Sequence, residues 1–279
     1  MAQVASVSVT LRPARRATRL PPRRCPNPAR PTVSVVIPAL NEADNLRHVL
    51  PLIPDDIDEV LLVDGHSTDS TVLAACELRP DIRIVLQQGR GKGAALRSGF
   101  AAARGDIVVM LDADGSMHPG EIPAFVGALL AGADMAKGSR FLQGGGTADM
   151  PALRRAGNWG LLTLVRLLFG SRYSDLCYGY NAFWRRVLPR LELDGDGFEI
   201  ETMMNIRALR AGLRVVEVPS FEARRIYGKG RLRTFPDGWR VLKTILRELQ
   251  DSRRAAARRR SPSALWLRKA KMGSAAHEG

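Results

Sequence analysis

The sequence has few cysteines and no long hydrophobic run. Its 279 residues contain three cysteines, without a Cys-x-x-Cys pair or a cluster of cysteine and histidine, which excludes a disulfide scaffold and a zinc module. No apolar stretch is long enough to cross a bilayer. Proline-rich sequence, with no apolar segment, follows the first arginines, so a secretory signal is not indicated. We therefore expect a cytoplasmic protein that is soluble or peripheral to a membrane.

Aromatic residues are scarce at 6%, and acidic residues are rare at both ends of the chain. Residues 1–30 hold seven Arg and no acid, and residues 240–271 hold eleven basic and two acidic residues. The net charge of +14 therefore belongs to the ends, while residues 31–239 are nearly neutral. No helix-turn-helix, zinc-finger or RNA-recognition signature appears, so we expect no specific nucleic-acid partner, and non-specific nucleic-acid binding is the alternative class.

The two ends differ in pattern. Residues 1–30 are rich in Pro, Ala and Arg without periodicity, which predicts a disordered basic arm. Residues 239–249 repeat apolar side chains at helical spacing, and Leu265-Trp266-Leu267 follows the Arg run 253–260. We expect a basic tail over residues 252–279 that suits an anionic membrane surface. A core helix followed by a solvated basic tail is the alternative.

Four short apolar runs each lead into a polar loop and a segment with helical spacing. The runs are residues 33–37, 60–63, 82–86 and 107–111, and further helices are expected at 153–169 and 198–211. Strands that alternate with helices predict an α/β fold, with a mostly parallel sheet covered by helices on both faces. We expect one continuous domain over residues 31–251. Asn41 is placed to cap the first helix.

Asp112-Ala113-Asp114 is the sharpest chemical signal, because two carboxylates one residue apart follow an apolar strand. Mg²⁺ and Mn²⁺ take oxygen ligands and commonly bridge a carboxylate to a diphosphate. Ligands of parallel sheets bind beyond the carboxyl ends of the strands, where Asp64 and Asp69 also fall. Asp69 is expected to cap the next helix, and Asp64 to contact a nucleoside. Gly89 to Gly93 lacks the spacing of a phosphate loop of nucleotide hydrolases.

These motifs together resemble those of family 2 glycosyltransferases. The resemblance rests on five ordered segments: Ser34 to Glu42, Val63 to Asp69, Gly91-Lys92-Gly93, Asp112 to Ser116, and Gly138-Ser139-Arg140. It covers roughly residues 33–245 and is strongest toward the polyprenyl-phosphate, or dolichyl-phosphate, mannose and glucose synthases. Such a resemblance implies the GT-A fold, a Rossmann-like arrangement in a single domain.

The resemblance also implies roles for individual residues at the donor site. The residues expected to bind the nucleotide sugar are Pro38, Ala39, Glu42, Asp64, Lys92, Asp112 and Arg140. Asp112 and Asp114 would hold Mg²⁺ or Mn²⁺, and Arg140 would clamp the diphosphate. Ser116 stands where these synthases often have a Gln metal ligand.

For the acceptor, the segment from Arg225 to Leu232 resembles the family's Arg-x-x-Gly-x-Ser-Lys-Leu motif. Arg225, Lys229 and Arg231 are therefore expected to hold an acceptor phosphate. In the segment 174–183, Asn181 replaces the family's Arg.

The resemblance implies inverting transfer of mannose or glucose from GDP-mannose or UDP-glucose to a polyprenyl phosphate. A lipid phosphate is already anionic near neutral pH and needs no strong base. A soluble acceptor hydroxyl is the alternative, and its proton would go to Asp175, Glu201 or Glu199, in that order. Residues two apart on a helix do not share a face, so at most one of the two glutamates is expected in the site. With Asp114 and Arg140, Asp175 and Glu201 complete the predicted catalytic set. A nucleotidyltransferase is disfavoured because the Gly-rich loop after the first strand is missing.

Overall fold

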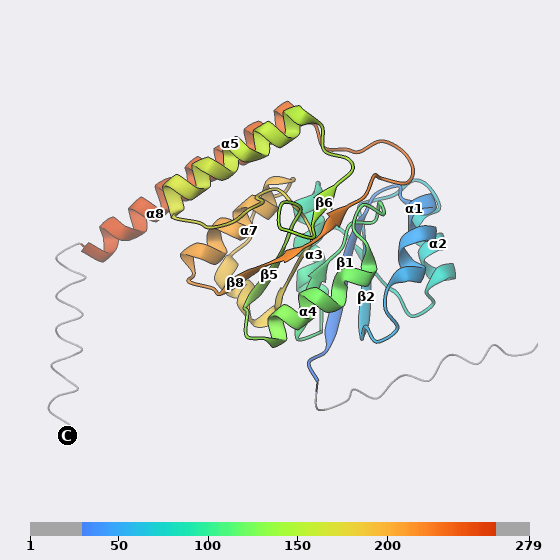
Figure 1. Cartoon of the computed structure of the whole chain (residues 1–279). Coiled ribbons are helices and arrows are strands. Elements are labelled where there is room, and N and C mark those ends of the chain that lie inside the picture. The colour runs from blue at the N-terminus through green and yellow to red at the C-terminus, as the bar shows by residue number, and fades with distance from the viewer. Residues whose placement is uncertain (1–29, 261–279) are drawn as a thin grey trace, which may run out of the picture. The chain divides into compact units, whose positions relative to one another are not determined.

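The computed structural model describes residues 30–260, drawn in colour in Figure 1. The expected arm, apart from Arg30, and the apolar cluster at 265–267 lie outside the described residues. The strands are β1 (Val33–Ala39), β2 (Glu59–Asp64), β3 (Arg83–Leu86), β4 (Ile107–Met110), β5 (Met135–Ser139), β6 (Gly146–Thr147), β7 (Asn181–Trp184), β8 (Val215–Pro219) and β9 (Phe221–Glu222).

Helices alternate with the early strands and dominate the later half of the chain. The α-helices are α1 (Ala43–Val49), α2 (Thr71–Leu78), α3 (Lys92–Ala102), α4 (Ile122–Leu130), α5 (Ala152–Phe169), α6 (Leu188–Leu191), α7 (Glu199–Arg210) and α8 (Thr234–Arg260). Short 3₁₀ turns cover Leu50–Leu52, Pro119–Glu121 and Arg185–Val187. None of the helices within residues 30–260 is long and apolar enough to span a membrane.

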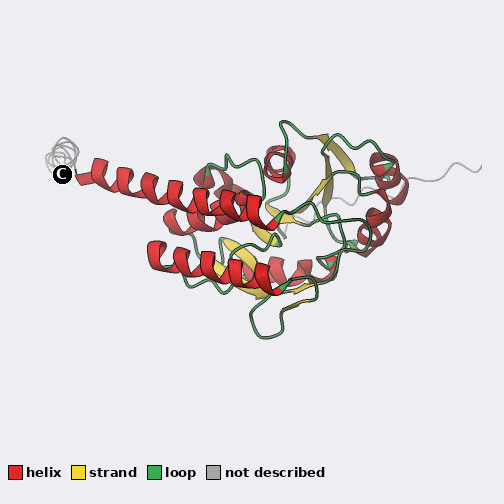
Figure 2. Ribbon diagram, turned by 90° about the horizontal axis from the view of Figure 1, so that it is seen from above, coloured by secondary structure: helices red, strands yellow, loops and turns green. Residues whose placement is uncertain are grey.

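Seven strands form one sheet in the order β3-β2-β1-β4-β7-β5-β8. Its strands pair in parallel, except that β7 runs antiparallel to both neighbours, β4 and β5. A separate parallel pair joins β6 to β9. In Figure 2 helices flank the strands on both sides. The expected α/β fold, with a mostly parallel sheet in a single domain, is confirmed.

Alternate side chains of each central strand enter two different cores, as the two-residue repeat of a strand requires. Val35 and Ile37 of β1 pack in a cluster with Phe125 of α4 on one face. Val36, between them, packs in a cluster with Leu96 of α3 and Ile200 of α7 on the other. Because both faces are covered, these strands read as continuous apolar runs.

A third apolar cluster joins α5, α7 and α8 outside the sheet. Leu162 and Val165 of α5, Ile206 of α7, and Val241 and Ile245 of α8 are its buried members. Figure 1 shows α5 and α8 side by side above α7. The helix expected near residue 239 is therefore anchored to the domain, and it continues to Arg260, so the expected boundary after residue 251 lies within one helix.

The first helix begins differently from expectation. Asn41 does not cap it, since α1 starts at Ala43 and its N-cap is Glu42. Asn41 adopts a positive φ of 54°, a conformation that Asn tolerates well. Its side-chain oxygen accepts a hydrogen bond from the backbone N–H of Thr68 at 2.8 Å. Asn41 therefore links the loops after β1 and β2, which both border the site.

Candidate active site

A cleft of about 790 Å³ lies where β1, β2 and β4 end. Of the residues expected at the donor and acceptor sites, those that line it are Pro38, Ala39, Glu42, Lys92, Asp112, Asp114, Arg140, Glu201, Arg225 and Arg231. The structure thus brings together residues that are as far apart in sequence as Pro38 and Arg231. Parallel strands place their carboxyl ends at one edge of the sheet, which explains the convergence of the early motifs.

Three expected residues, Asp64, Asp175 and Lys229, are not among those that line the cleft. Asp64 is buried at the end of β2 and accepts the backbone N–H of Ser67 at 3.2 Å. Asp175 is fully buried below the cleft wall, and Lys229 is exposed on the surface loop before α8. Asp69 accepts hydrogen bonds from the N–H of Thr71, the first residue of α2, at 2.9 Å and from the N–H of Ala43 at 3.3 Å, but the N-cap residue of α2 is Ser70 and not Asp69 as expected.

Lys92, the first residue of α3, forms ion pairs with two carboxylates in the cleft. Its Nζ lies 2.7 Å from Oδ1 of Asp112 and 2.8 Å from Oε1 of Glu201. Burial lowers the pKa of Lys92, but the two carboxylates outweigh burial and hold that pKa above its ordinary value. Burial raises the pKa of Asp112 to about 6, with the charge of Lys92 opposing the shift. Lys92 is therefore a fixed positive charge beside the first aspartate of the motif.

Asp114 has its own cationic partner. Its Oδ1 accepts the backbone N–H of Ser116 at 3.0 Å and the Ser116 hydroxyl at 2.7 Å. Its Oδ2 lies 3.4 Å from Nη1 of Arg225, and Nη2 of the same arginine contacts Glu42. Arg225 therefore bridges a predicted metal ligand and a predicted nucleoside-binding residue. Each aspartate of the motif faces one positive side chain.

The carboxylates of the aspartate motif fit a hard divalent cation. Asp112 and Asp114 are the two carboxylates of the motif in the cleft, and within residues 30–260 no group of three or more His, Cys, Asp or Glu side chains is arranged to hold a metal. Mg²⁺ usually keeps several waters and takes one or two carboxylates plus substrate phosphates. Two protein ligands are thus enough, provided that Lys92 and Arg225 turn toward the diphosphate.

The segment 223–232 packs at the part of the cleft that Leu40 and Glu42 line. Tyr227 donates its N–H to Oδ1 of Asn45 at 2.8 Å and accepts from Nδ2 of Asn45 at 3.2 Å. Arg231 donates to the carbonyl of Leu40 at 2.8 Å. Two of the three residues expected to hold an acceptor phosphate, Arg225 and Arg231, thus lie near the expected nucleoside-binding residues.

Arg140 is committed to protein partners. Its Nε and Nη2 form a bidentate pair with Asp175 at 2.7 and 2.9 Å, and Nη1 donates to both oxygens of Glu222 at 3.1 Å. Nη2 also donates to the carbonyl of Cys177 at 3.3 Å. All five N–H groups of the guanidinium are therefore used. The diphosphate clamp stays a prediction, and it requires Arg140 to exchange a partner.

The positions of the carboxylates change the order of the candidates for a general base and place Glu201 before Asp175. Burial raises the pKa of Asp175, but the hydrogen bonds and charge of Arg140 outweigh it and hold the pKa below its ordinary value. Such a group is a weak base without access to the cleft. Glu199 accepts the N–H groups of Asp196 and Gly197 at 3.1 and 2.9 Å. Only Glu201 of the helical pair lines the cleft, in agreement with the expectation from their spacing.

Glu222 and Arg154 are among the cleft residues that the sequence-based expectations did not include. Glu222 lines the cleft in β9, just beyond the carboxyl end of β8, where the rule on strand ends points. Arg154 of α5 also lines the cleft, and no ion pair within residues 30–260 involves it. A single arginine in an amphipathic helix carries no sequence signal of its own.

The glycines before α3 serve packing. Gly91 has a φ of 99°, and a Cβ there would lie 2.3 Å from the carbonyl oxygen of Asp196. That carbonyl accepts the N–H groups of Gly93 at 2.8 Å and Ala94 at 3.2 Å. The N–H groups that would cradle a phosphate in a phosphate-binding loop are therefore already satisfied by protein.

The family model for glycosyl transferase family 2 matches residues 34–191. Polyprenol monophosphomannose synthase from Mycolicibacterium smegmatis is 35% identical over 209 residues, which cover 70% of this chain and 79% of that protein. Undecaprenyl-phosphate mannosyltransferase from Micrococcus luteus is 32% identical over 216 residues, which cover 72% of this chain and 87% of that protein.

A solved structure of another glycosyltransferase is also similar to this chain. Glucosyl-3-phosphoglycerate synthase from Mycobacterium tuberculosis, in complex with Mn²⁺, UDP-glucose and phosphoglyceric acid, matches with a TM-score of 0.63 and 27% identity. The match covers 79% of this chain and 80% of that one. The fold is the GT-A fold. The ordered motifs and the extent of these matches show that the chain belongs to glycosyltransferase family 2.

Proposed function

We propose that this enzyme transfers a hexose, mannose or glucose, from a nucleotide sugar to a polyprenyl phosphate at the cytoplasmic face of a membrane, with Mg²⁺ or Mn²⁺ bound at Asp112 and Asp114. GDP-mannose and UDP-glucose are the donors to test. The two curated relatives, named for polyprenol and undecaprenyl phosphates, support the lipid acceptor. The solved relative, with Mn²⁺ and UDP-glucose, supports the metal and the class of donor.

One observation carries the donor chemistry. Asp112 and Asp114 lie in one cleft, and each faces a cation, Lys92 or Arg225. A nucleoside diphosphate with its metal presents the same alternation of negative and positive charge. The metal would therefore take the place of Lys92 and Arg225 as partner of the two aspartates. The diphosphate would take the place of the aspartates as partner of Lys92 and Arg225.

The reaction is direct displacement at the anomeric carbon, with the nucleoside diphosphate as leaving group. When bound, the divalent cation supplies electrostatic stabilisation of the negative charge on that leaving group. Lys92 and Arg225 add two further positive charges at the same place, held by the start of α3 and by the segment 223–232. A phosphate acceptor attacks as an anion and requires no proton transfer, because its second pKa is about 6.

Release of GDP or UDP from a panel of GDP- and UDP-sugars, with Mn²⁺ and with or without a short-chain polyprenyl phosphate, tests the proposal. We expect release from one donor to depend on the lipid phosphate, with the labelled sugar in the organic phase. Omission of the metal, with EDTA, is the control for the cation. Donor hydrolysis that ignores the lipid phosphate would refute the lipid acceptor and leave the transferase chemistry intact.

A soluble acceptor hydroxyl is the second candidate, favoured by one observation. Glu201 and Glu222 both line the cleft and can take a proton from a hydroxyl, a step that a phosphate acceptor does not need. The solved relative binds phosphoglyceric acid. Transfer of label from the donor to phosphoglyceric acid in the aqueous phase would favour this candidate.

The outer face of α8 supports a membrane contact. Phe235, Trp239 and Leu246 are 75, 57 and 45% exposed, and their spacing places them on one face of the helix. Lys243 lies over the Trp239 ring at 5.6 Å, and Arg247 is half-exposed beside them. An aromatic stripe flanked by bases suits an anionic lipid surface. The helix combines the buried face of a core helix with a second apolar face that is exposed, and this exposed face supports the proposed membrane contact.

A further inference from the structure

A group of charged side chains lies buried behind the wall of the cleft. Arg140 lines the cleft, and its partner Asp175 is 0% exposed. The group also contains Lys137 of β5, which is 0% exposed, and Glu217 of β8. Lysine is almost never fully buried unless it is paired. The proposed reaction gives Lys137 no role, so its burial requires another cause.

The ammonium group of Lys137 has few partners. Its Nζ donates to the carbonyl of Gly138 at 3.0 Å, and it lies 5.8 Å from the centre of the Tyr173 ring. Oε1 of Glu217 is 3.8 Å away, which is beyond hydrogen-bond distance. An ammonium group has three donors. Within residues 30–260 the Gly138 carbonyl is its one hydrogen-bond acceptor, so the positive charge of Lys137 is only partly matched.

Glu217 joins Lys137 to the loop that carries Asp175. Its carboxylate accepts the N–H of Ser174 at 2.9 and 3.0 Å, and the Ser174 hydroxyl at 2.9 Å. It also accepts the N–H of Asp175 at 3.4 Å. The hydroxyl oxygens of Ser174 and Ser139 lie 2.6 Å apart, which ties the same loop to β5. Lys137 and Asp175 therefore belong to one connected polar group.

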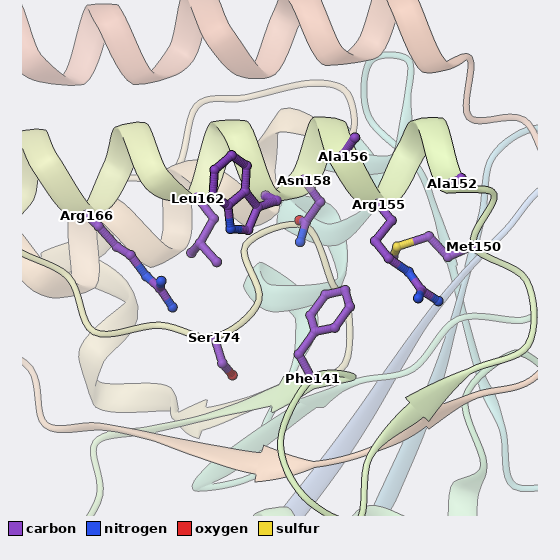
Figure 3. Close-up of a pocket in the computed structure, with 10 residues that line it drawn as sticks. Phe141, Met150, Ala152, Arg155, Ala156, Asn158, Leu162, Arg166 and Ser174 are labelled. Atoms are coloured by element: carbon purple, nitrogen blue, oxygen red, sulfur yellow. The ribbon is translucent and has the colours of Figure 1, made fainter.

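The Asp175 carboxylate is closed off from the two spaces beside it. In Figure 3 Ser174 and Phe141 lie opposite α5 on the wall of a second pocket, of about 760 Å³. Ser174 lines this pocket and Arg140 lines the cleft, but Asp175 lines neither. A clamp on the diphosphate takes Arg140 away from Asp175. Because a buried carboxylate without a partner is unfavourable, another cation of the protein must then compensate it.

The charges of this group favour Lys137 as that cation. Burial raises the pKa of Asp175, and the hydrogen bonds of Arg140 and the charge of Lys137 outweigh it. Burial lowers the pKa of Lys137, Asp175 and Glu217 oppose that shift, and the charge of Arg140 adds to it. A move of Arg140 away from Asp175 therefore favours the charged form of Lys137.

The neighbouring strand β7 supplies no cation opposite Lys137. Asn181 is the direct partner of Lys137 in the sheet, and cross-strand partners share a face. Asn181 is fully buried, and its Oδ1 has no hydrogen-bond partner in the described part of the chain. Asn181 also replaces the family's Arg, so the positive charge at this pair of strands comes from Lys137.

Resting on the proposed function, in which Arg140 turns to the diphosphate of the donor, we propose that Lys137 is a positioning residue that serves as the counter-ion of Asp175 while Arg140 holds the diphosphate. Lys137 itself does not line the cleft and acts through Arg140. Without Lys137, Arg140 stays on Asp175, because its departure would leave a buried carboxylate without a cation. Lys137 thus sets how readily Arg140 changes partner.

The test measures the Kd of GDP and of UDP in the presence of Mn²⁺, by isothermal titration calorimetry of the full chain. We expect Lys137→Met to raise the Kd of the nucleotide that the wild type binds about tenfold. Lys137→Gln can still donate to the Gly138 carbonyl and repeats the test with a second neutral side chain. Asp175→Asn should not raise this Kd, because Arg140 then leaves no buried charge behind.

The double variant Lys137→Met/Asp175→Asn separates this role from a loss of packing. We expect its Kd to return to within about twofold of that of Asp175→Asn, since no carboxylate then needs the cation. Ile245→Ala makes a cavity in the apolar cluster of α5, α7 and α8 and is the control. It should lower the melting temperature and leave the Kd unchanged. The melting temperature of every variant distinguishes a change of Kd from unfolding.

The outcomes distinguish the role of Lys137 from the proposed function. If the wild type binds a nucleotide and Lys137→Met binds it equally well, the role of Lys137 is overturned while the donor chemistry stands. A loss in Lys137→Met that persists in the double variant would also overturn it, because the effect then does not pass through Asp175. If the wild type binds neither GDP nor UDP, the nucleotide-sugar donor and the role of Lys137 fail together.

Discussion

Nζ of Lys92 lies 2.7 Å from Oδ1 of Asp112, the first carboxylate of the aspartate motif. The same ammonium group binds Glu201 from the far half of the chain, at 2.8 Å. One cation thus links α3, the end of β4 and α7 across the floor of the cleft. Its removal leaves two carboxylates close together in a partly desolvated place, which is unfavourable unless another cation takes its position.

Lys92→Met should therefore lower the free energy of unfolding by about 3 kcal/mol in the presence of EDTA. Mn²⁺ should stabilise the variant more than it stabilises the wild type, because the metal supplies the missing positive charge. Urea unfolding with and without Mn²⁺ measures both effects. Lys243→Met, on the exposed face of α8, is the control and should change neither. Equal stabilisation by Mn²⁺ in Lys92→Met and the wild type would contradict the expectation.

Asp114→Ala should reduce sugar transfer at least about a hundredfold, since the second carboxylate for the metal is lost. The fold should tolerate the change, because Asp114 is partly exposed and its other contacts are with Ser116 and Arg225. Steady-state rates at saturating Mn²⁺ and a thermal melt check the two parts. Asp55→Ala, at an exposed loop position, should keep full activity. Undiminished turnover in Asp114→Ala would remove this residue from the metal site.

Arg140 and Asp175 form a buried pair, so each depends on the other. Arg140→Met should lower the free energy of unfolding by about 3 to 5 kcal/mol, because it leaves the Asp175 carboxylate buried without its partner. Adding Asp175→Asn should recover part of that loss, since the uncompensated charge is then gone. Urea unfolding of the two single variants and the double variant forms the cycle. Purely additive losses would show that the two side chains do not stabilise each other.

Much of the site could be predicted from the sequence, because the early strands form clear apolar runs. Asp112 and Asp114 could be placed in a cleft because the apolar run before them marks a strand of a parallel sheet, and parallel strands end together. The contact of Arg225 with Glu42 joins residues 183 positions apart, and no local pattern encodes it. The partners of Arg140 could not be predicted from the sequence either. They depend on the strand order β7-β5-β8, which includes an antiparallel strand that no local pattern encodes.

Trp239→Ser should weaken binding to vesicles of phosphatidylglycerol about tenfold, because one aromatic side chain no longer enters the interface. High salt should weaken binding of the wild type further, since Lys243 and Arg247 act through exposed charges. Co-sedimentation measures both effects. Leu73→Ser removes a side chain of similar exposure, 60%, from α2 and should have no effect. Unchanged partitioning of Trp239→Ser would exclude this face of α8 as the contact.

The two cysteines within the described residues should differ in reactivity. Burial raises the pKa of the Cys177 thiol to about 11, and the charge of Glu201 adds to the shift. The reactive thiolate of Cys177 thus appears only as the pH rises toward that value, whereas Cys76 is exposed. At pH 8, iodoacetamide should label Cys76 at least about tenfold faster than Cys177. Mass spectrometry of the labelled peptides measures the rates, with Cys76→Ser as control, and equal rates would refute the difference.

The segment 223–232, which contacts Asn45 and the Leu40 carbonyl beside the cleft, comes from beyond residue 191, where the match to the family model ends. Arg225 and Arg231 therefore reach back across the molecule to Glu42 and to the Leu40 carbonyl. If Arg225 and Arg231 contact the donor as the proposed function requires, residues 34–191, which match the family model, do not hold all of the donor contacts in this chain. We expect an exchange of C-terminal segments between two such enzymes to carry part of the donor affinity with it, together with α8, the proposed membrane contact.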